Sequence, residues 1–305
     1  MPCSKTTAAA CTRQQFHHHV LLPALAVVLL AALLLFGRTA DSLDNAKRAE
    51  DDAIGSCTQP LALDVDEGPC TIERVKLDDL TADEFEARFK EKQPVIVVTG
   101  MPYNQRLREA VERDSLLAEY GDMIVSLGTA ESYTGRTSLQ VPFRRYINEM
   151  ITQPQTLESL GNETYYLFGS AQGKRFPELL KAYRLPPFDA AVQEGQYSTL
   201  SFGLAGKNSG VPFHGHGPGW SEVLHGRKRW FLYPRDDART PSEIVHFDPD
   251  ASQLQWLSSV YPTLQPSDRP IQCTIKPGEI LYFPTWWVHA VLNLDPYTSF
   301  VSTFQ

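Results

Sequence analysis

The sequence predicts a mainly β fold, a double-stranded β-helix or jelly roll, preceded by a part that mixes helices with short strands. Two observations lead to this prediction. After about Tyr197, short β-branched and aromatic runs alternate with Gly, Pro and Asp turns. Before that point, several segments show the apolar spacing of helices. A content of 42% hydrophobic and 21% charged residues is ordinary for a globular protein, so we expect a sizeable core.

The chain starts with a segment that suits a membrane. Residues 20–36 are uninterrupted apolar residues, and Lys5 and Arg13 precede them. At about 1.5 Å per residue a helix of this length spans roughly 25 Å, slightly less than a typical hydrocarbon core. We predict a signal peptide or a signal anchor over 20–37. The anchor is favoured because Arg38 stands where a small residue is preferred before cleavage after Ala40.

Both alternatives put the rest of the chain on the far side of the membrane. Residues 1–19 would be the cytosolic flank of a type II protein, and we expect residues after about 40 in the lumen of the endoplasmic reticulum. They would be membrane-anchored, or soluble after signal cleavage. The triplet Asn162-Glu-Thr is an acceptor for N-glycosylation in that compartment.

The cysteines fit an oxidising compartment as well. Cys57, Cys70 and Cys273 are the cysteines after the apolar run, and this odd number permits one disulfide and one free thiol. We predict that Cys70 forms the disulfide. Cys273 is preferred over Cys57 as its partner, because Cys70 and Cys273 lie on strand-like segments of the folded domain whereas Cys57 lies in a linker.

The linker covers residues 38–68, which are polar, acidic and without periodicity. The folded domain then covers 69–305, with a helical and strand part over 69–196 and a β-barrel over 197–305. In the first part, Thr81 and Glu84 form a capping box, and Phe85 and Phe89 form an apolar pair on the helix that follows. Its strands are expected at "CTIERV", "PVIVV", "MIVSL" and "TYYLFG", and its further helices at "RDSLLAEYG", "FRRYINEMI" and "FPELLKAY".

The barrel strands follow in turn. They are expected at "YSTLSFGLAG", "SEVLHG", "KRWFLYP", "IQCTIKPG", "EILYFP", "HAVLNL" and "TSFVSTF". The net charge of −8 is spread along the chain without a Lys/Arg block, which argues against nucleic acid as a partner. We expect a protein partner or a protein substrate, with membrane contact only through the N-terminal apolar segment.

Three histidines are candidate metal ligands. His214 and His216 lie one residue apart, and His289 lies among apolar residues downstream. Alternate side chains of an extended strand share a face, so the first two would point the same way on a strand. Imidazole suits Fe, Zn, Cu and Ni. The spacing alone leaves a second interpretation open, in which these histidines are exposed to solvent or hydrogen-bonded in the core.

The segments around these histidines resemble a known family. "GRKRWFLYP" (226–234), "PGEILYFPTWWVHAVLNLD" (277–295) and "STF" near the end resemble jumonji-C (JmjC) proteins, a branch of the cupin and 2-oxoglutarate oxygenase superfamily. The likeness extends back to roughly "CTIERV". It implies a JmjC barrel in which His214, His216 and His289 hold Fe(II) or another divalent transition metal, with 2-oxoglutarate as cosubstrate.

The resemblance also implies cosubstrate contacts and shows departures from the family pattern. Lys228 matches the basic anchor for the distal carboxylate of 2-oxoglutarate, Tyr166 matches a tyrosine that contacts it, and Asn293 matches an asparagine beside the third ligand. In contrast, His216 stands where the family has an acid. Val211 and Val301 stand at positions where the family often has residues with a side-chain hydroxyl. Glu222 is a candidate substitute for the missing acid, and this alternative is disfavoured.

Three functions are therefore considered. The first is a regulatory or scaffold protein with weak or no oxygenase activity. The second is an active Fe(II)/2-oxoglutarate-dependent protein hydroxylase, and the third is a three-histidine dioxygenase or a metal-dependent small-molecule binder. Because the expected compartment holds no chromatin, the resemblance is not taken to imply histone demethylation.

Overall fold

The computed structural model describes residues 64–129, 138–153, 165–168, 176–196, 199–236, 243 and 251–305. The folded unit runs from Pro60 to Gln305. The apolar segment predicted over 20–37, Cys57 and the sequon at Asn162 lie outside the described residues. Within the described ranges, no helix has both the length and the apolar character needed to cross a membrane.

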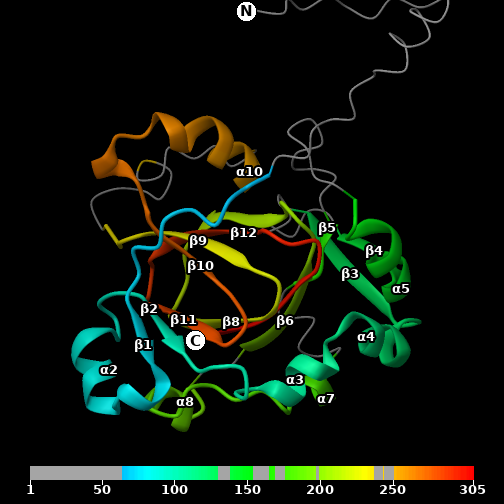
Figure 1. The fold of residues 1–305 in the computed structure, drawn as a ribbon, viewed down its shortest axis with the longest axis horizontal. Coiled ribbons are helices and arrows are strands. Elements are labelled where there is room, and N and C mark those ends of the chain that lie inside the picture. The colour runs from blue at the N-terminus through cyan, green and yellow to red at the C-terminus, as the bar shows by residue number, and fades with distance from the viewer. Residues whose placement is uncertain are drawn as a thin grey trace, which may run out of the picture. The chain divides into compact units, whose positions relative to one another are not determined.

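Two sheets face each other and form the barrel (Figure 1). The larger sheet has the strand order β1-β2-β11-β8-β13-β6 and the smaller one β10-β9-β12-β7. In the larger sheet the bounds are β1 Arg74–Lys76, β2 Val95–Val98, β6 Thr199–Ala205, β8 Gly219–His225, β11 Glu279–Phe283 and β13 Thr298–Phe304. In the smaller sheet they are β7 Gly210–His214, β9 Lys228–Tyr233, β10 Ile271–Ile275 and β12 Val288–Asn293. The predicted jelly-roll fold is consistent with this arrangement.

Each barrel strand alternates between the interior and an outer layer. On β9, Trp230 and Leu232 join the interior cluster, whereas Phe231 and Tyr233 pack outward. The outward residues meet Trp256, next to α10 (Gln253–Gln255), which covers the smaller sheet in Figure 1. Successive side chains of a strand point to opposite faces, and here both faces are buried. This explains why the strand segments are apolar or aromatic at nearly every position of the sequence.

The part before the barrel packs against the larger sheet. Thr81 caps α2 by accepting a hydrogen bond from the Glu84 N–H at 3.2 Å, as the sequence predicts. Phe85 and Phe89 are fully buried and pack against the outer faces of β2, β8 and β11. The bounds of the helices are α2 Ala82–Arg88, α3 Gln105–Ala110, α4 Arg113–Tyr120, α5 Phe143–Arg145, α7 Pro177–Leu180 and α8 Ala190–Gln193.

A third sheet of order β4-β3-β5 completes this part, with β3 at Ile124–Thr129, β4 at Ser138–Pro142 and β5 at Tyr165–Tyr166. Strand β4 has no counterpart among the predicted strands, and neither has β7 of the barrel. Two predicted strands differ from the expected bounds: "CTIERV" (70–75) is a strand only in its last two residues, which begin β1, and the described part of "TYYLFG" is a strand only at Tyr165–Tyr166. In the first case Thr71 instead donates its N–H to the Gln272 carbonyl at 2.8 Å, beside β10.

A disulfide joins Cys70 to Cys273, which confirms the pairing preferred from the sequence. It ties the segment before β1 to β10, 203 residues further along the chain. The residues just before it also contact the barrel: Asp66 forms an ion pair with Arg229 at 3.1 Å. The end of the predicted linker is therefore held against the domain.

Candidate metal centre

His214, His216 and His289 come together in the barrel. One ring nitrogen of each lies within 4.8 Å of a ring nitrogen of the other two. His289 comes from β12 and faces His214 at the end of β7, because these two residues are register partners in the antiparallel pair. The ring centroids of this pair are 4.3 Å apart, and His216 lies 4.8 Å from His289. The sequence prediction that the three histidines converge agrees with this geometry.

The backbone fixes the tautomer of every ring. Nδ1 lies 2.8 Å from the Pro212 carbonyl in His214, 2.8 Å from the Gly217 carbonyl in His216, and 2.7 Å from the Trp287 carbonyl in His289. A carbonyl oxygen only accepts, so each Nδ1 carries the proton and donates. The lone pair of each neutral ring is therefore on Nε2, the arrangement that a metal-ligating histidine needs.

The surroundings keep the rings neutral. Burial lowers the pKa of His214 to about 3 and lowers the pKa of His216 as well. The pKa of His289, which is 2% exposed, lies well below its usual value because of burial and the neighbouring His214 and His216. A cation therefore meets no competition from protons at these rings near neutral pH.

The donor set fits a divalent transition metal. In tetrahedral coordination, metal–nitrogen bonds of about 2.1 Å place the ligand nitrogens about 3.4 Å apart. The three ring nitrogens already lie within 4.8 Å of one another, so movements of each side chain by less than about 1 Å bring them to this distance. Within the described residues no carboxylate joins this group.

The local structure of His216 differs from the prediction. Strand β7 ends at His214, so His216 lies in the loop that follows and does not share the strand face by alternation. Its position is instead fixed by the Trp286 N–H, which donates to the His216 carbonyl at 2.8 Å. The loop between β11 and β12 thereby holds the second candidate ligand.

Aromatic side chains line the rest of the centre. The ring of Phe283 lies 4.7 Å from that of His289, and Phe304 lies 4.6 Å from His216. Trp230 lies 5.6 Å from His289, and its buried Nε1 has no hydrogen-bond partner among the described residues. These rings fill much of the interior next to the candidate ligands.

Lys228 lies in the barrel as predicted, but its amino group is enclosed by rings. Its Nζ is 3.2 Å from the centroid of Phe300, 5.5 Å from that of Trp230 and 5.8 Å from that of Phe168. The side chain is buried and forms no ion pair within the described part of the chain. Burial holds the pKa of Lys228 well below its usual value.

Tyr166 and Asn293 are also in this region. Tyr166 is buried in the interior cluster, with its ring 6.4 Å from Phe168. Asn293 is the register partner of Lys228, four residues beyond His289. Its Nδ2 donates to the Ser209 carbonyl at 2.9 Å, while its buried Oδ1 has no hydrogen-bond partner in the described part of the chain. The amide therefore supports the turn before β7, and its role towards a cosubstrate stays a prediction.

The two valines at expected hydroxyl positions face in opposite directions. Val211 belongs to the interior cluster, as the resemblance implies. Val301 instead packs outward against the helical part, while Phe300 faces the interior. A register shift between Ser299 and Phe300 in the β13–β8 pairing accompanies this arrangement. Val301 is thus not a position that a cosubstrate in the barrel could contact, and the expectation for it is wrong.

Glu222 does not replace the missing acid. It lies on β8 between Ser221 and Val223, and Val223 belongs to the interior cluster, so Glu222 points out of the barrel. Its Oε2 accepts a hydrogen bond from Asn104 at 2.7 Å, and Arg108 lies 3.6 Å from its Oε1. Burial raises the pKa of Glu222 to about 7. Arg108 comes from α3 and Asn104 from the residue just before it, and no local pattern in the sequence predicts either contact.

Comparisons with known proteins agree with this geometry. Residues 81–304 match the model of the cupin-like domain. The chain is 45% identical over 239 residues to JmjC domain-containing protein 8 of Homo sapiens, covering 78% of this chain and 85% of the relative. It is 29% identical over 244 residues to lysine-specific demethylase JMJ21 of Arabidopsis thaliana, which covers 74% of this chain and 24% of that protein. It is also 29% identical over 199 residues to the 2-oxoglutarate and iron-dependent oxygenase JMJD4 of Gallus gallus, covering 60% of this chain and 46% of the relative.

Proposed function

This chain belongs to the JmjC branch of the cupin-like domain family, and on that premise we propose a metal-binding regulatory or scaffold protein with weak or no oxygenase activity. The proposed ligands are His214, His216 and His289. The metal would be Fe(II) or another divalent transition ion.

One observation carries this proposal: three neutral imidazoles converge and no carboxylate joins them within the described residues. Imidazole nitrogen favours late divalent transition metals, so the set suits metal binding. A carboxylate ligand would offset part of the charge of an Fe(II) ion, and three neutral rings do not. We therefore expect a weaker preference for Fe(II) than a site with an acid would have.

The residues fit 2-oxoglutarate less well than they fit a metal. Lys228 has a phenyl ring 3.2 Å from its amino nitrogen and a pKa lowered by burial, so it is a poor cation for a carboxylate. Val211 offers no hydroxyl donor. A redox-active metal would supply the oxygen chemistry of an oxygenase, and the protein would supply binding and orientation. Here the binding groups for the cosubstrate are few.

Metal analysis of the purified protein tests the first half of the proposal. We expect about one equivalent of a divalent transition metal after loading, and its loss on His214→Ala or His289→Ala. His216→Asp should raise the affinity for Fe(II), because it restores an anionic ligand. Metal content that does not depend on these histidines would refute the site.

Succinate release from 2-oxoglutarate tests the second half. We expect little or none from the unmodified protein with Fe(II). The alternative, an active Fe(II)/2-oxoglutarate-dependent protein hydroxylase, is favoured by the similarity to a relative named as such an oxygenase. Robust succinate release that His216→Ala abolishes would establish that alternative and would show that the three-histidine site is catalytic.

The compartment is part of the proposal. We propose that the domain lies in the lumen of the endoplasmic reticulum and acts on or with a protein partner. The apolar run at 20–36 and the sequon at Asn162 support this, and so does the Cys70–Cys273 disulfide, because disulfides persist in oxidising compartments. A glycosidase-sensitive mass that Asn162→Gln removes is expected. Digestion of the domain by protease in intact microsomes would contradict the placement.

A further inference from the structure

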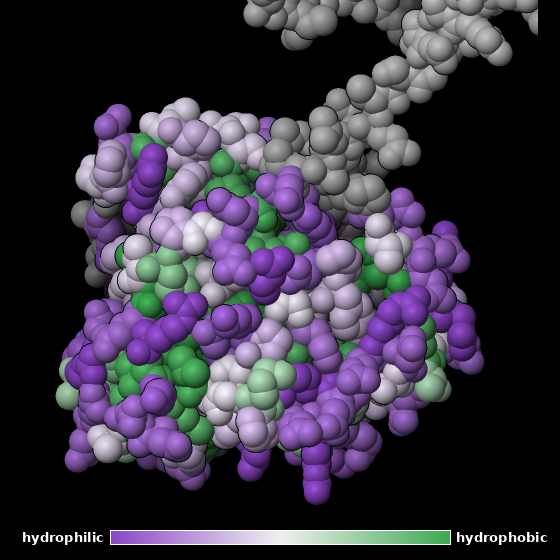
Figure 2. Space-filling view, in the orientation of Figure 1, coloured by the Kyte–Doolittle hydropathy of each residue, from purple (hydrophilic) through white to green (hydrophobic). Residues whose placement is uncertain are grey.

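Outside the barrel, the described surface carries a polar pocket at the start of α3. On the face shown in Figure 2, hydrophilic residues predominate and hydrophobic ones form separate groups. The pocket lies between α3 and the segment 182–184 that follows α7, and its volume is ≈ 610 Å³. Arg106, Glu109 and Arg184 are the charged residues that line it. Pockets of several hundred Å³ are of the size that holds a small molecule.

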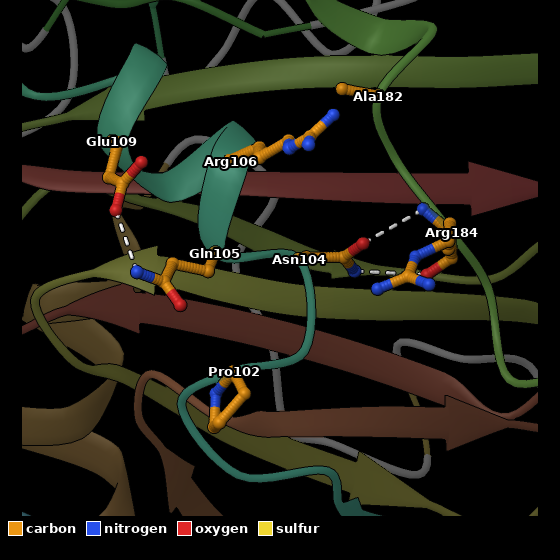
Figure 3. Close-up of a pocket in the computed structure, with 7 residues that line it drawn as sticks. All are labelled: Pro102, Asn104, Gln105, Arg106, Glu109, Ala182 and Arg184. Carbon is orange, nitrogen blue, oxygen red and sulfur yellow. Dashed lines mark hydrogen bonds between the residues drawn. The ribbon is translucent and has the colours of Figure 1, made fainter.

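Two arginines dominate the charge of this pocket. Arg106 and Arg184 extend towards the space between α3 and the 182–184 segment (Figure 3). Neither forms an ion pair within the described residues, although most other described arginines do. The carboxylate of Glu109, which also lines the pocket, accepts a hydrogen bond from Gln105 at 2.7 Å (Figure 3). Two guanidinium groups without ion pairs among the described residues therefore share one hollow with a single carboxylate, in a chain whose net charge is −8.

Arg184 is held in place from two sides. Its backbone N–H donates to Asn104 Oδ1 at 2.9 Å, and its carbonyl accepts from Asn104 Nδ2 at 2.9 Å (Figure 3). Its guanidinium carbon lies 5.2 Å from the ring centroid of Tyr103, whose hydroxyl donates to the Leu185 carbonyl. A guanidinium stacked on a fixed ring keeps its edge donors available for an anion.

The base of the pocket is buried and hydrogen-bonded to its surroundings. Asn104 is 2% exposed and has a left-handed backbone, with φ of 51°. Its Nδ2 also donates to Glu222 Oε2 at 2.7 Å, and Glu222 in turn lies beside Arg108. Asn104 thus connects the pocket lining to the strand β8 and fixes the spacing of the two segments that carry the arginines.

We propose that this pocket binds a small organic anion through a carboxylate or phosphate group held between Arg106 and Arg184. Guanidinium groups bind both kinds of oxyanion with paired hydrogen bonds. The site is separate from the histidine centre, since none of the three histidines lines it, and Asn104 at its base contacts Glu222, which points out of the barrel. It does not depend on metal or on the proposed function.

Titration calorimetry of the purified protein tests the proposal, with inorganic phosphate and succinate as separate probes at constant ionic strength. We expect saturable binding of at least one probe. Arg106→Gln combined with Arg184→Gln should weaken it at least about tenfold. Ala182→Phe should weaken it as well, because a large side chain would occupy the pocket while both charges remain. Arg145→Gln, an exposed arginine on α5, is the matched control and should leave binding unchanged.

The two probes separate the sources of the anion. Binding of phosphate alone would indicate a phosphorylated ligand, and binding of succinate alone a carboxylate. Absence of saturable binding by both would overturn the proposal. So would equal binding by the double arginine variant, since that result would place the anion elsewhere, for example at Lys228. Circular dichroism of each variant should match that of the unmodified protein, because the changed side chains are exposed.

Discussion

The substitution Glu222→Gln should remove a pH dependence of folding stability that the structure assigns to one buried carboxyl group. Glu222 is fully buried, and burial raises its pKa from 4.5 to about 7. The groups that face it are Asn104, Arg108, Tyr103 and Tyr183, all from the helical part of the domain. Glutamine keeps the volume and an oxygen that accepts from Asn104.

The sign follows from the direction of the shift. The folded state holds the proton more tightly than the unfolded state, so the stabilising contribution of Glu222 is complete below about pH 4.5. It is lost as the pH rises to 7 and stays lost above that. A shift of about 2.5 pH units corresponds to about 3 kcal/mol of free energy of unfolding.

Denaturant unfolding at pH 5 and pH 8, followed by tryptophan fluorescence, measures this. The unfolding free energy of the unmodified protein, relative to Glu222→Gln, should fall by about 2–3 kcal/mol from pH 5 to pH 8. Groups that titrate in both proteins cancel in this difference. Arg108 remains bonded in the variant, because it also donates to the Met101 carbonyl at 2.8 Å. Glu149→Gln, an exposed control, should show no such change.

Two results would refute the reasoning. A variant whose stability differs from that of the unmodified protein by the same amount at both pH values would mean that Glu222 has an ordinary pKa. Loss of bound metal in Glu222→Gln, with the fold intact, would mean that Glu222 reaches the histidine centre after all.

Two further predictions concern the barrel. Cys70→Ser should lower the free energy of unfolding by up to about 5 kcal/mol, which is the chain-entropy limit for a loop of some 200 residues. In denaturant unfolding, the variant should match the unmodified protein after its disulfide is reduced. A variant as stable as the oxidised unmodified protein would contradict this prediction. Lys228→Met should raise the free energy of unfolding by roughly 1 kcal/mol or more, because it replaces a buried amino group without an acidic partner by an apolar chain of similar length. A lower thermal midpoint for Lys228→Met would show that the cation–ring contact with Phe300 outweighs the cost of burial.

Most of the barrel follows from the sequence because its strands are bounded by turn residues. Segments such as "KRWFLYP" and "EILYFP" became β9 and β11. The capping box at Thr81 predicts the start of α2 for a similarly local reason, since its hydrogen bond to Glu84 spans three residues. Strand β4 was missed because Val141 is its only β-branched residue and a proline ends it, so its pairing with β3 decides its conformation.

The site was harder to predict because side-chain direction depends on pairing between distant strands. The family resemblance assigned Val301 to the barrel interior, yet a one-residue change of register moves a side chain to the opposite face. The partners of Glu222 and the pocket at Arg184 depend on Asn104, which contacts residues 80 and 118 positions away. No local pattern of residues in the sequence predicts contacts between positions so far apart.

The three histidines differ in how firmly the fold holds them, and this decides how their substitutions should be interpreted. His289 is buried on β12 between Trp230 and Phe283, so removal of its ring leaves a cavity in the core, with a cost of a few kcal/mol. His216 is partly exposed in a loop and is held through its backbone carbonyl, which every substitution at this position retains. His216→Asp should therefore fold as the unmodified protein does, and a change in its metal preference would reflect ligand chemistry alone. For His289→Ala, loss of metal therefore supports the site only when an unfolding curve shows that the barrel has remained intact.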